Sequence, residues 1–310
     1  MNPVEPATAA GSVVCILNAH AGSDGAGKVR AQLSELFAAT GMPVTIVMAE
    51  SGDALAVAAR QAVAQRCRLV VAAGGDGTVS TVASALAATG IVLGVLPLGT
   101  LNHFAKDLKI PLALEAAVAT LFAGRVTAVD IGEVNGRRFV NNSSIGLYPT
   151  VVRRREGLQA QGSRKWTAFV QAAAYAVLRY ARLTVTLDVK GGETVREDTP
   201  FVFVGNNRYE RSGLRVGERS RLDEGRLWIY RAPRATRAGL LRLALRALLG
   251  RPADGDLLQI EAAEFRIVTR RKRIPVATDG EVAILATPLH YRILPHALCV
   301  MVPAADQPAA

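Results

Sequence analysis

The sequence predicts an α/β protein in two parts: a doubly wound parallel sheet, followed by a mostly antiparallel second domain. Three observations lead to this fold class. Before residue 130, short apolar runs alternate with segments of helical periodicity, which is typical of a parallel sheet covered by helices. Glycine-containing loops follow several of these runs. After Val129 the runs become rich in β-branched and aromatic residues and are separated by Gly, Asn and Asp, as in antiparallel sheets.

The first part supplies strands and helices in alternation. Each expected strand is an apolar run of about six residues, which suits a buried strand and is too short for a helix. The strands are VVCILN (13–18), VTIVMA (44–49), RLVVAA (68–73) and IVLGVLP (91–97). The helices are expected over 26–39, 53–66, 79–88 and roughly 112–123. Asp53 is the expected N-cap of the second helix.

The second part predicts a series of short strands. They are FVNNSSIG (139–146), RLTVTLDV (182–189), TPFVFVGN (199–206), GRLWIYRA (225–232) and EFRIVTR (264–270), and the tail HYRILPHALCVMVP (290–303) has strand signals too. Two helical segments interrupt them, at roughly 164–182 and 235–249. The second belongs to a basic amphipathic stretch, 234–251, in which Arg237, Arg242 and Arg246 stand among leucines. Such a helix either lies on an anionic surface or packs on its own domain with its arginines extended to water.

The excess positive charge lies in the second part of the chain. Residues 1–130 carry 8 Lys or Arg and 9 Asp or Glu, a net charge of −1, whereas residues 131–310 carry 29 and 17, a net charge of +12. This favours an anionic partner such as phospholipid headgroups, a phosphorylated ligand or nucleic acid, unless the surface is merely solvated and Arg-rich. Nucleic acid is the weakest of these, because only 5% of residues are aromatic and they are not interleaved with the basic ones.

The composition of the chain and the absence of certain motifs argue against several classes of protein. Cys15, Cys67 and Cys299 have no paired spacing, so a reducing cytosol is expected rather than a disulfide framework or structural zinc. The N-terminal segment lacks the basic start of a signal peptide, and no uncharged apolar run approaches the length of about eighteen residues that a membrane span needs. The patterns H-x-x-x-H, C-x-x-C and G-x-S-x-G are absent, which argues against catalytic zinc and a serine hydrolase. No G-x-G-x-x-G follows the first strand, as a Rossmann site would require.

The segment VVAAGGDGT (70–78) is the most informative one. Gly74, Gly75 and Gly77 surround Asp76 between an expected strand and an expected helix. Glycines let the backbone approach a ligand closely, and the amides of a helix N-terminus attract anions, so this turn suits a phosphate. Asp76 beside that phosphate would hold a metal ion, a ribose hydroxyl or the proton of an attacking hydroxyl. The alternative is that Asp76 only caps the helix.

Two further loops follow strands in the same part of the chain. GSDGAGKV (22–29) nearly matches a P-loop, with Val29 where a hydroxyl would meet Mg²⁺, and PLGTLNHFAKDL (97–108) follows the fourth strand. Open α/β sheets bind ligands at the carboxyl ends of their parallel strands. The three loops together predict a phosphate site at that edge.

These segments carry a family resemblance. NAHAG (18–22), GGDGT (74–78), PLGTLNHFAKDL (97–108), LDEGRLW (222–228) and DGE (279–281) follow one another in this order. Over roughly residues 12–303 the chain resembles the bacterial diacylglycerol kinase and lipid kinase family, which is similar in its catalytic fold to sphingosine and ceramide kinases. The resemblance implies an α/β nucleotide-binding domain over 11–130, for which 290–303 is a candidate completing segment. It also implies a β-sandwich lipid-acceptor domain over 131–289 and an active site between the two.

The resemblance also implies roles for individual residues. In DGE, Asp279 or Glu281 would be the general base on the lipid hydroxyl, with Asp279 preferred and Asp76 as the remaining candidate. A structural Mg²⁺ would be held by Glu224 in the Asp223-Glu224-Gly225 motif, with the carbonyls of Arg221 and Arg226. The residues assigned to ATP binding are Asn18, Ala19, His20, Ala21, Gly22, Gly74, Gly75, Asp76, Gly77, Thr78, Thr100 and Asn102.

Three positions depart from the family pattern. Glu224 stands where a second Asp is expected, His103 replaces another Asp, and Ser80-Thr81 replaces Asn-Glu. The loss of carboxylates would weaken metal binding, change the choice of acceptor or mark a subfamily with another lipid substrate.

The sequence therefore predicts an ATP- and Mg²⁺-dependent kinase that phosphorylates the hydroxyl of a diacylglycerol-type lipid. It would be cytoplasmic and peripherally associated with an anionic membrane surface. Nucleotide and lipid are the expected partners, nucleic acid is not, and a homodimer is left open. One alternative is an NAD kinase-like small-molecule kinase, against which the 97–108 loop and the basic second domain argue. The other is a nucleotide- or lipid-binding homologue without turnover, which His103 and Thr81 keep open.

Overall fold

The computed structural model describes residues 11–21, 25–147, 183–210, 218–232 and 257–304, together with residues 149, 236 and 239. The chain divides into two compact units, residues 1–131 with 295–310 and residues 132–294. The helical segment expected over 164–182 and Gly22 lie outside the described residues. So does the basic stretch 234–251, apart from residues 236 and 239.

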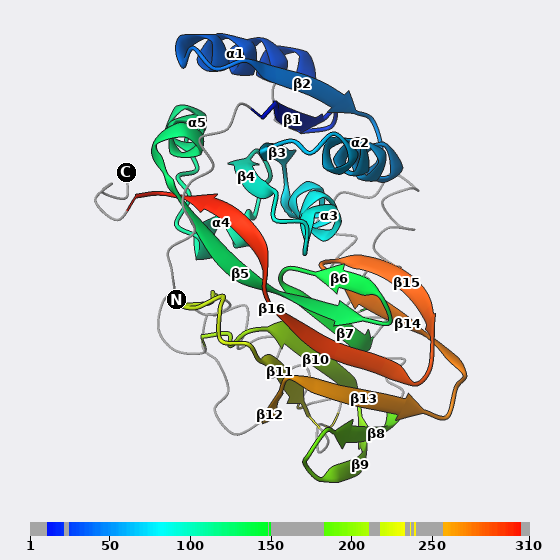
Figure 1. Cartoon of the computed structure of the whole chain (residues 1–310). Coiled ribbons are helices and arrows are strands. Elements are labelled where there is room, and N and C mark those ends of the chain that lie inside the picture. The colour runs from blue at the N-terminus through cyan, green and yellow to red at the C-terminus, as the bar shows by residue number, and fades with distance from the viewer. Residues whose placement is uncertain are drawn as a thin grey trace. The chain divides into compact units, whose positions relative to one another are not determined.

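The first unit contains a parallel sheet with the strand order β2-β1-β3-β4-β16 (Figure 1). Its strands are β1 (Val13–Asn18), β2 (Val44–Ala49), β3 (Leu69–Gly74), β4 (Val92–Pro97) and the C-terminal half of β16 (Leu289–Val302). The last pairing places Cys299 opposite Val92 and Val300 opposite Leu93. The sheet forms because each strand is an apolar run, and most of its residues are fully buried.

Two pairs of helices cover this sheet. The helices are α1 (Ala26–Ala39), α2 (Gly52–Ala64), α3 (Asp76–Leu86), α4 (His103–Asp107) and α5 (Leu114–Ala123). Helices α1 and α5 contact each other, as do α2 and α3, and the strands lie between the two pairs (Figure 1). The prediction of a doubly wound parallel sheet is confirmed.

The ends of several elements differ from the sequence prediction, and two helices show this most clearly. Ser51, not Asp53, caps α2: its backbone is extended, and its Oγ accepts the N–H of Ala54 at 3.1 Å. Asp53 lies inside the first turn, where its charge still favours the helix dipole. Helix α3 begins at Asp76 rather than Val79, so part of the glycine-rich turn is helical.

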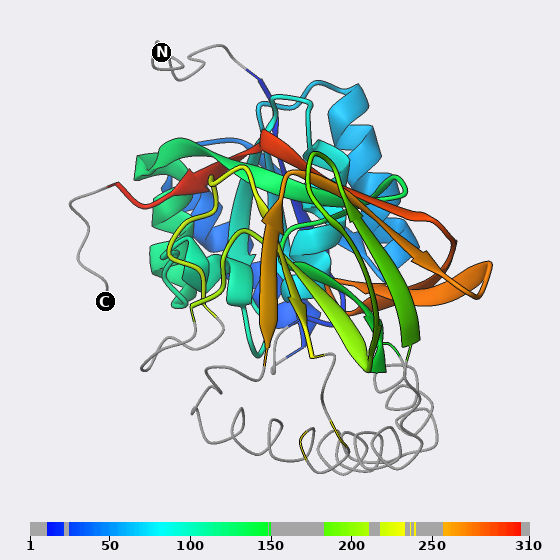
Figure 2. The ribbon, with the colours of Figure 1, turned by 90° about the horizontal axis from the view of Figure 1, so that it is seen from below.

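The second unit is a sandwich of two antiparallel sheets. One has six strands in the order β12-β11-β10-β7-β14-β15, and the other runs from the N-terminal half of β16 through β13 and β8 to β9 (Figure 2). Residues from both sheets, such as Ile145, Ile229, Phe265 and Tyr291, share one buried core. The expected β-sandwich is therefore confirmed.

Several strands of the second unit were not predicted. The strands of the six-stranded sheet are β7 (Asn142–Gly146), β10 (Phe201–Asn206), β11 (Leu227–Arg231), β12 (Leu258–Ala262), β14 (Arg273–Thr278) and β15 (Glu281–Ala286). The other sheet has β8 (Leu183–Val189), β9 (Thr194–Thr199) and β13 (Glu264–Thr269), and β5 (Arg125–Val134) pairs with β6 (Arg137–Phe139) and β16. Strands β5, β6, β9, β12, β14 and β15 are additions to the predicted set.

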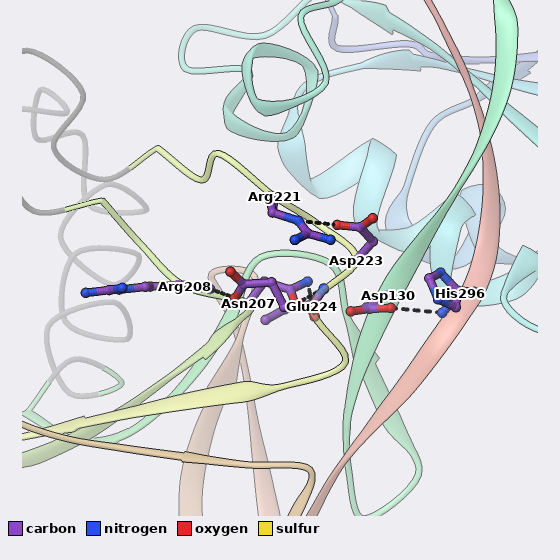
Figure 3. Close-up of polar contacts among 8 residues, drawn as sticks. Asp130, Asn207, Arg208, Arg221, Asp223, Glu224 and His296 are labelled. Atoms are coloured by element: carbon purple, nitrogen blue, oxygen red, sulfur yellow. Dashed lines mark hydrogen bonds and ion pairs between the residues drawn. The ribbon is translucent and has the colours of Figure 1, made fainter.

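Strands β5 and β16 each contribute residues to both units. In the first unit, the buried carboxylate of Asp130 on β5 accepts the backbone N–H of His296 on β16 at 2.9 Å (Figure 3). His296 has a φ of 51°, so the strand is locally distorted there. Among the described residues, no helix is both long and apolar enough to cross a membrane.

Candidate functional site

Asn18 links the end of β1 to the first turn of α3. Its Nδ2 donates to Oγ1 of Thr78 at 3.0 Å, and its Oδ1 accepts the backbone N–H of His20 at 2.9 Å. The N–H of Ala19 donates to the carbonyl of Ala49, and that of Ala21 to the carbonyl of Asn18. Three amides of the NAHAG loop therefore already have acceptors within the protein, and its contribution to phosphate binding would come from other atoms.

The turn between β3 and α3 presents a helix N-terminus. Gly75 is the N-cap, with extended backbone and no side-chain cap, and Asp76, Gly77 and Thr78 form the first turn of α3. The first amides of a helix have no partner within it and carry a partial positive charge. Oδ1 of Asp76 accepts the N–H of Phe104 at 3.4 Å, which links this turn to α4. Such a turn can hold an anion.

The loop after β4 approaches the glycine turn closely. The N–H of Leu98 donates to the carbonyl of Gly74 at 3.0 Å. A Cβ atom at Gly99 would lie 2.5 Å from Cα of Gly75. Glycine is therefore required at position 99 for the two loops to meet.

Asn102 fixes the shape of this third loop. Its backbone is left-handed, with φ 51°. Its side-chain oxygen accepts the N–H of Gly99 at 3.0 Å, and its Nδ2 donates to the carbonyls of Gly99 and Pro97 at 2.9 and 3.3 Å. Asn102 is buried, whereas Thr100 and His103 are exposed. Asn102 thus shapes the loop. Of the two residues in this loop that were assigned to ATP binding, Thr100 is the one whose side chain a ligand can reach.

In the second unit, the DGE motif forms a tight hairpin. Asp279 and Gly280 are the two turn residues between β14 and β15, with φ values of 48° and 89°. Thr278 pairs with Glu281 across the turn. Positive φ at both central residues is the pattern of a type I′ turn, for which Asp-Gly is a favoured sequence.

The carboxylate of Asp279 is bonded to three consecutive backbone amides. Its Oδ2 accepts the N–H of Val140 at 2.8 Å, and its Oδ1 accepts those of Asn141 and Asn142 at 2.8 and 3.0 Å. Hydrogen bonds to an ionised carboxylate are stronger than neutral ones. Asp279 therefore ties the DGE hairpin to the connection between β6 and β7.

Arg219 binds carbonyl and side-chain oxygens of the same connection. It belongs to no sequence motif that would distinguish it from the other arginines of the chain. It is 3% exposed. Its Nη1 donates to the carbonyls of Val140 and Asn206 at 2.7 and 2.9 Å, and its Nη2 donates to Oδ1 of Asn141 at 2.7 Å. Arg219 and Asp279 together fix residues 140–142.

Glu281 has different surroundings from Asp279. Its side chain is 61% exposed, and Oε2 lies 3.6 Å from Nη2 of Arg137. An exposed pair of this length contributes little to stability. The carboxylate of Glu281 is thus accessible to a ligand.

The segment expected to hold a structural Mg²⁺ is a hydrogen-bonded loop (Figure 3). Glu224 Oε2 accepts the N–H of Arg208 at 3.2 Å, and the N–H of Glu224 donates to Oδ1 of Asn207 at 3.1 Å. Asp223 accepts a hydrogen bond from Nε of Arg221 at 3.0 Å. These carboxylates and backbone carbonyls are hard oxygen ligands of the kind that Mg²⁺ binds, so the set fits in chemical kind. One oxygen of each carboxylate already accepts a hydrogen bond, from Arg208 for Glu224 and from Arg221 for Asp223, so a metal ion would bind through the second oxygen.

Comparison with known families gives two adjoining matches. Residues 12–134 match the diacylglycerol kinase catalytic domain. Residues 145–302 match the YegS C-terminal NAD kinase beta sandwich-like domain. The second match spans about half of the chain.

Individual relatives agree with these matches. The chain is 31% identical over 187 residues to a protein named "Probable lipid kinase YegS-like" from Pectobacterium atrosepticum and 30% identical over 187 residues to one of the same name from Yersinia enterocolitica. Each alignment covers 57% of this chain, and the chain spans 60% and 61% of the length of these relatives. Among solved structures, a diacylglycerol kinase of Bacillus anthracis has a TM-score of 0.68 at 20% identity, covering 96% of this chain and 97% of that one. This last likeness concerns the fold alone.

Proposed function

Because the chain belongs to the YegS-like lipid kinase family, with its diacylglycerol kinase catalytic domain and YegS C-terminal domain, we propose that it transfers the γ-phosphoryl group of ATP to the hydroxyl of a diacylglycerol-type lipid. The observation that carries this proposal is the meeting of three loops at the ends of β1, β3 and β4. Asn18 bonds Thr78, Asp76 bonds Phe104, and Gly75 adjoins Gly99.

The proposed phosphate site is the N-terminus of α3. Phosphoryl transfer requires an in-line hydroxyl and neutralisation of phosphate charge, and it needs little covalent help from the protein. Amides held at a helix N-terminus supply such charge stabilisation without rearranging during the reaction. The amides of Asp76, Gly77 and Thr78 would bind the phosphates, while exposed Thr100 would line the same site.

Glu281 is the better candidate for the general base. A base needs a lone pair directed at the hydroxyl proton, and the carboxylate of Asp279 already accepts three backbone N–H groups. Glu281 is exposed and is held in place by the turn that Asp279 anchors. We therefore propose that Asp279 positions the hairpin and that Glu281 accepts the proton, the reverse of the preference drawn from sequence.

Mg²⁺ would accompany the nucleotide and neutralise phosphate charge. In the first unit, Asp76 is the carboxylate closest in sequence to the proposed phosphate amides and would support that ion. In the second unit, Glu224 with the carbonyls of Arg221 and Arg226 would hold a structural ion. The basic second part of the chain would attract the anionic surface in which a lipid acceptor lies.

A protein that binds nucleotide or lipid without turnover is the second candidate. His103 and Thr81 favour it, because they stand where the family has carboxylates, and His103 is exposed at the start of α4. An NAD kinase-like activity remains a further alternative, because the matched C-terminal domain is described as NAD kinase beta sandwich-like.

One assay distinguishes the three functions. The purified protein is incubated with radiolabelled ATP and Mg²⁺, either with a mixed lipid extract containing diacylglycerol or with NAD. A labelled lipid that is absent with Asp76→Asn supports the proposal. Labelled NADP supports the NAD kinase alternative, and ATP binding without a labelled product supports the non-catalytic one.

A further inference from the structure

Four consecutive basic residues occupy the turn between β13 and β14 and the first position of β14: Arg270, Arg271, Lys272 and Arg273. We call these four residues the basic turn. All four side chains are exposed. In Figure 1 the turn is the connection from the tip of β13 to the start of β14.

Hydrogen bonds hold the backbone of the basic turn in place. The carbonyl of Arg271 accepts the hydroxyls of Thr269 and Thr287, both at 2.9 Å. The carbonyl of Lys272 accepts the N–H of Thr287 at 2.9 Å. The four charges are therefore presented from a fixed scaffold, and ordering this backbone would add no cost when a partner binds.

The basic turn differs from other basic groups of the same unit in its lack of acidic partners. Lys190 pairs with Glu264 at 2.6 Å, Arg266 with Asp188 at 2.9 Å, and Arg292 with Glu133 at 2.7 Å. Within the part of the chain that the structure describes, no carboxylate lies within ion-pair distance of any side chain of the basic turn. Their positive charge is thus left for an external partner.

An exposed apolar side chain, that of Ile284, lies on the β14–β15 hairpin, which follows the basic turn. Arg273 pairs with Ala286 across the β14–β15 hairpin, and Pro275 pairs with Ile284. Residues two apart on a strand, and residues opposite each other on paired strands, share a face. Ile284 is 53% exposed. Arg273, the last residue of the basic turn, therefore shares a face with exposed apolar surface at Ile284.

We infer that the basic turn, with Ile284, is a docking contact for an anionic lipid surface. The inference rests on the proposed function, because a kinase for a membrane lipid must reach its acceptor at such a surface. Anionic headgroups attract clustered Lys and Arg, and an apolar side chain beside them gains by entering the interfacial region. Ile284 favours a membrane over nucleic acid, because a phosphate backbone offers it no apolar environment.

Vesicle binding tests this inference. Each Lys or Arg near an anionic surface strengthens binding about fivefold, so replacing all four by Gln should weaken binding to phosphatidylglycerol-containing vesicles by about 10²-fold or more at low salt. The wild-type affinity should fall as salt rises toward about 0.15 M. Ile284→Ser should weaken vesicle binding and leave any binding to a DNA duplex unchanged.

A matched control removes the same charge elsewhere. Arg60, Arg66, Arg125 and Arg196 are exposed, and replacing them by Gln lowers the net charge of +11 by the same four units. This variant should keep most of its vesicle binding. Equal losses in both variants would show that only overall charge matters and would overturn the inference. Unchanged vesicle binding after replacement of the basic turn would also overturn it. So would wild-type binding that is tighter to DNA than to vesicles and is lost when the basic turn is replaced.

A soluble short-chain diacylglycerol separates this inference from the proposed function. If the basic-turn variant phosphorylates it normally but binds vesicles weakly, both hold. If the wild type binds vesicles through the basic turn but phosphorylates no lipid, the docking contact stands and the proposed reaction is wrong.

Discussion

Asp279 and Glu281 stand two residues apart, yet their carboxylates meet different groups. Three backbone amides surround Asp279, whereas Glu281 faces solvent and Arg137. Removing an acceptor of three amides leaves them unsatisfied, which costs about 1–3 kcal/mol for each one that water does not reach. Removing an exposed carboxylate removes only its chemistry. The two residues therefore differ in what their loss should change.

Asp279→Ala should lower the free energy of unfolding by about 2–4 kcal/mol, because the amides of residues 140–142 lose their acceptor. Glu281→Gln should leave that free energy within about 0.5 kcal/mol and reduce kcat for lipid phosphorylation about 10²-fold or more. Urea denaturation and steady-state kinetics measure the two quantities. If Asp279→Ala keeps its stability and loses only kcat, Asp279 rather than Glu281 is the base.

Asp76 is tested by an isosteric change. Asp76→Asn should keep the fold, because an amide oxygen can still accept the N–H of Phe104. Phosphoryl transfer should fall by about 10² or more, because the charge that supports a metal ion or accepts a proton is gone. A thermal melt checks the first expectation and the ATP assay the second. Full activity in this variant would reduce Asp76 to a residue that joins two loops.

At the scale of secondary-structure elements, the close approach of two loops depends on Gly99. Gly99→Ala should force the β3–α3 and β4–α4 loops apart, because its Cβ would lie 2.5 Å from Cα of Gly75. We expect a loss of about 1–3 kcal/mol in stability together with weaker ATP binding. The control is Gly77→Ala, since a Cβ at that helical position meets nothing within 4 Å. It should be neutral or stabilise the protein by up to about 1 kcal/mol. Equal melting temperatures for both variants would contradict the steric argument.

Apolar runs predicted the elements of the first unit well. Strands β1 and β2 and helix α1 have the predicted bounds, because each apolar or amphipathic segment is bounded by turn residues. Strand β5 was missed, because its first half, Arg125 to Ala128, is largely exposed and lacks a core pattern. Strands β9, β14 and β15 have partly exposed or polar sequences whose pairing is decided by distant neighbours.

Residues of the candidate site could be predicted from the sequence where they belong to one short, continuous motif. The glycine turn at Asp76 lies at the N-terminus of α3, as a phosphate turn requires. The acceptor role of Asp279 was not predictable, because its partner amides lie up to 139 residues earlier in the sequence. Arg219 is a similar case, since its acceptors Val140 and Asn141 are distant in sequence and come together only in the folded chain.

At the scale of the whole molecule, buried acidic groups in both units make alkaline pH destabilising. Burial raises the pKa of the Cys15 thiol to about 12. Burial also raises the pKa of Tyr291, which a hydrogen bond with Ser143 partly offsets. In the unfolded chain the thiol ionises near pH 8.5 and the phenol near pH 10. The unfolded state thus releases protons first, and stability is lost as pH rises above about 8.5.

Urea denaturation between pH 8 and pH 10 should show this loss. The Cys15 thiol alone should contribute a decrease approaching about 1.4 kcal/mol per pH unit once the unfolded thiol is ionised. Cys15→Ala should be less stable at pH 8, because it leaves a small cavity, but should have a shallower dependence on pH. Parallel pH profiles for the two proteins would show that the thiol is not protected by burial.

The pairing of β4 with β16 sets an order for folding during synthesis. Val92 and Leu93 find their partners, Cys299 and Val300, about 200 residues later in the chain. At roughly 5–20 residues per second, a ribosome needs about 10–40 s to make that stretch. During this interval one edge of β4 has unpaired backbone groups and is open to aggregation. The second unit, residues 132–294, is synthesised within the same interval. The first unit is therefore the first to be synthesised in part but the last to be completed.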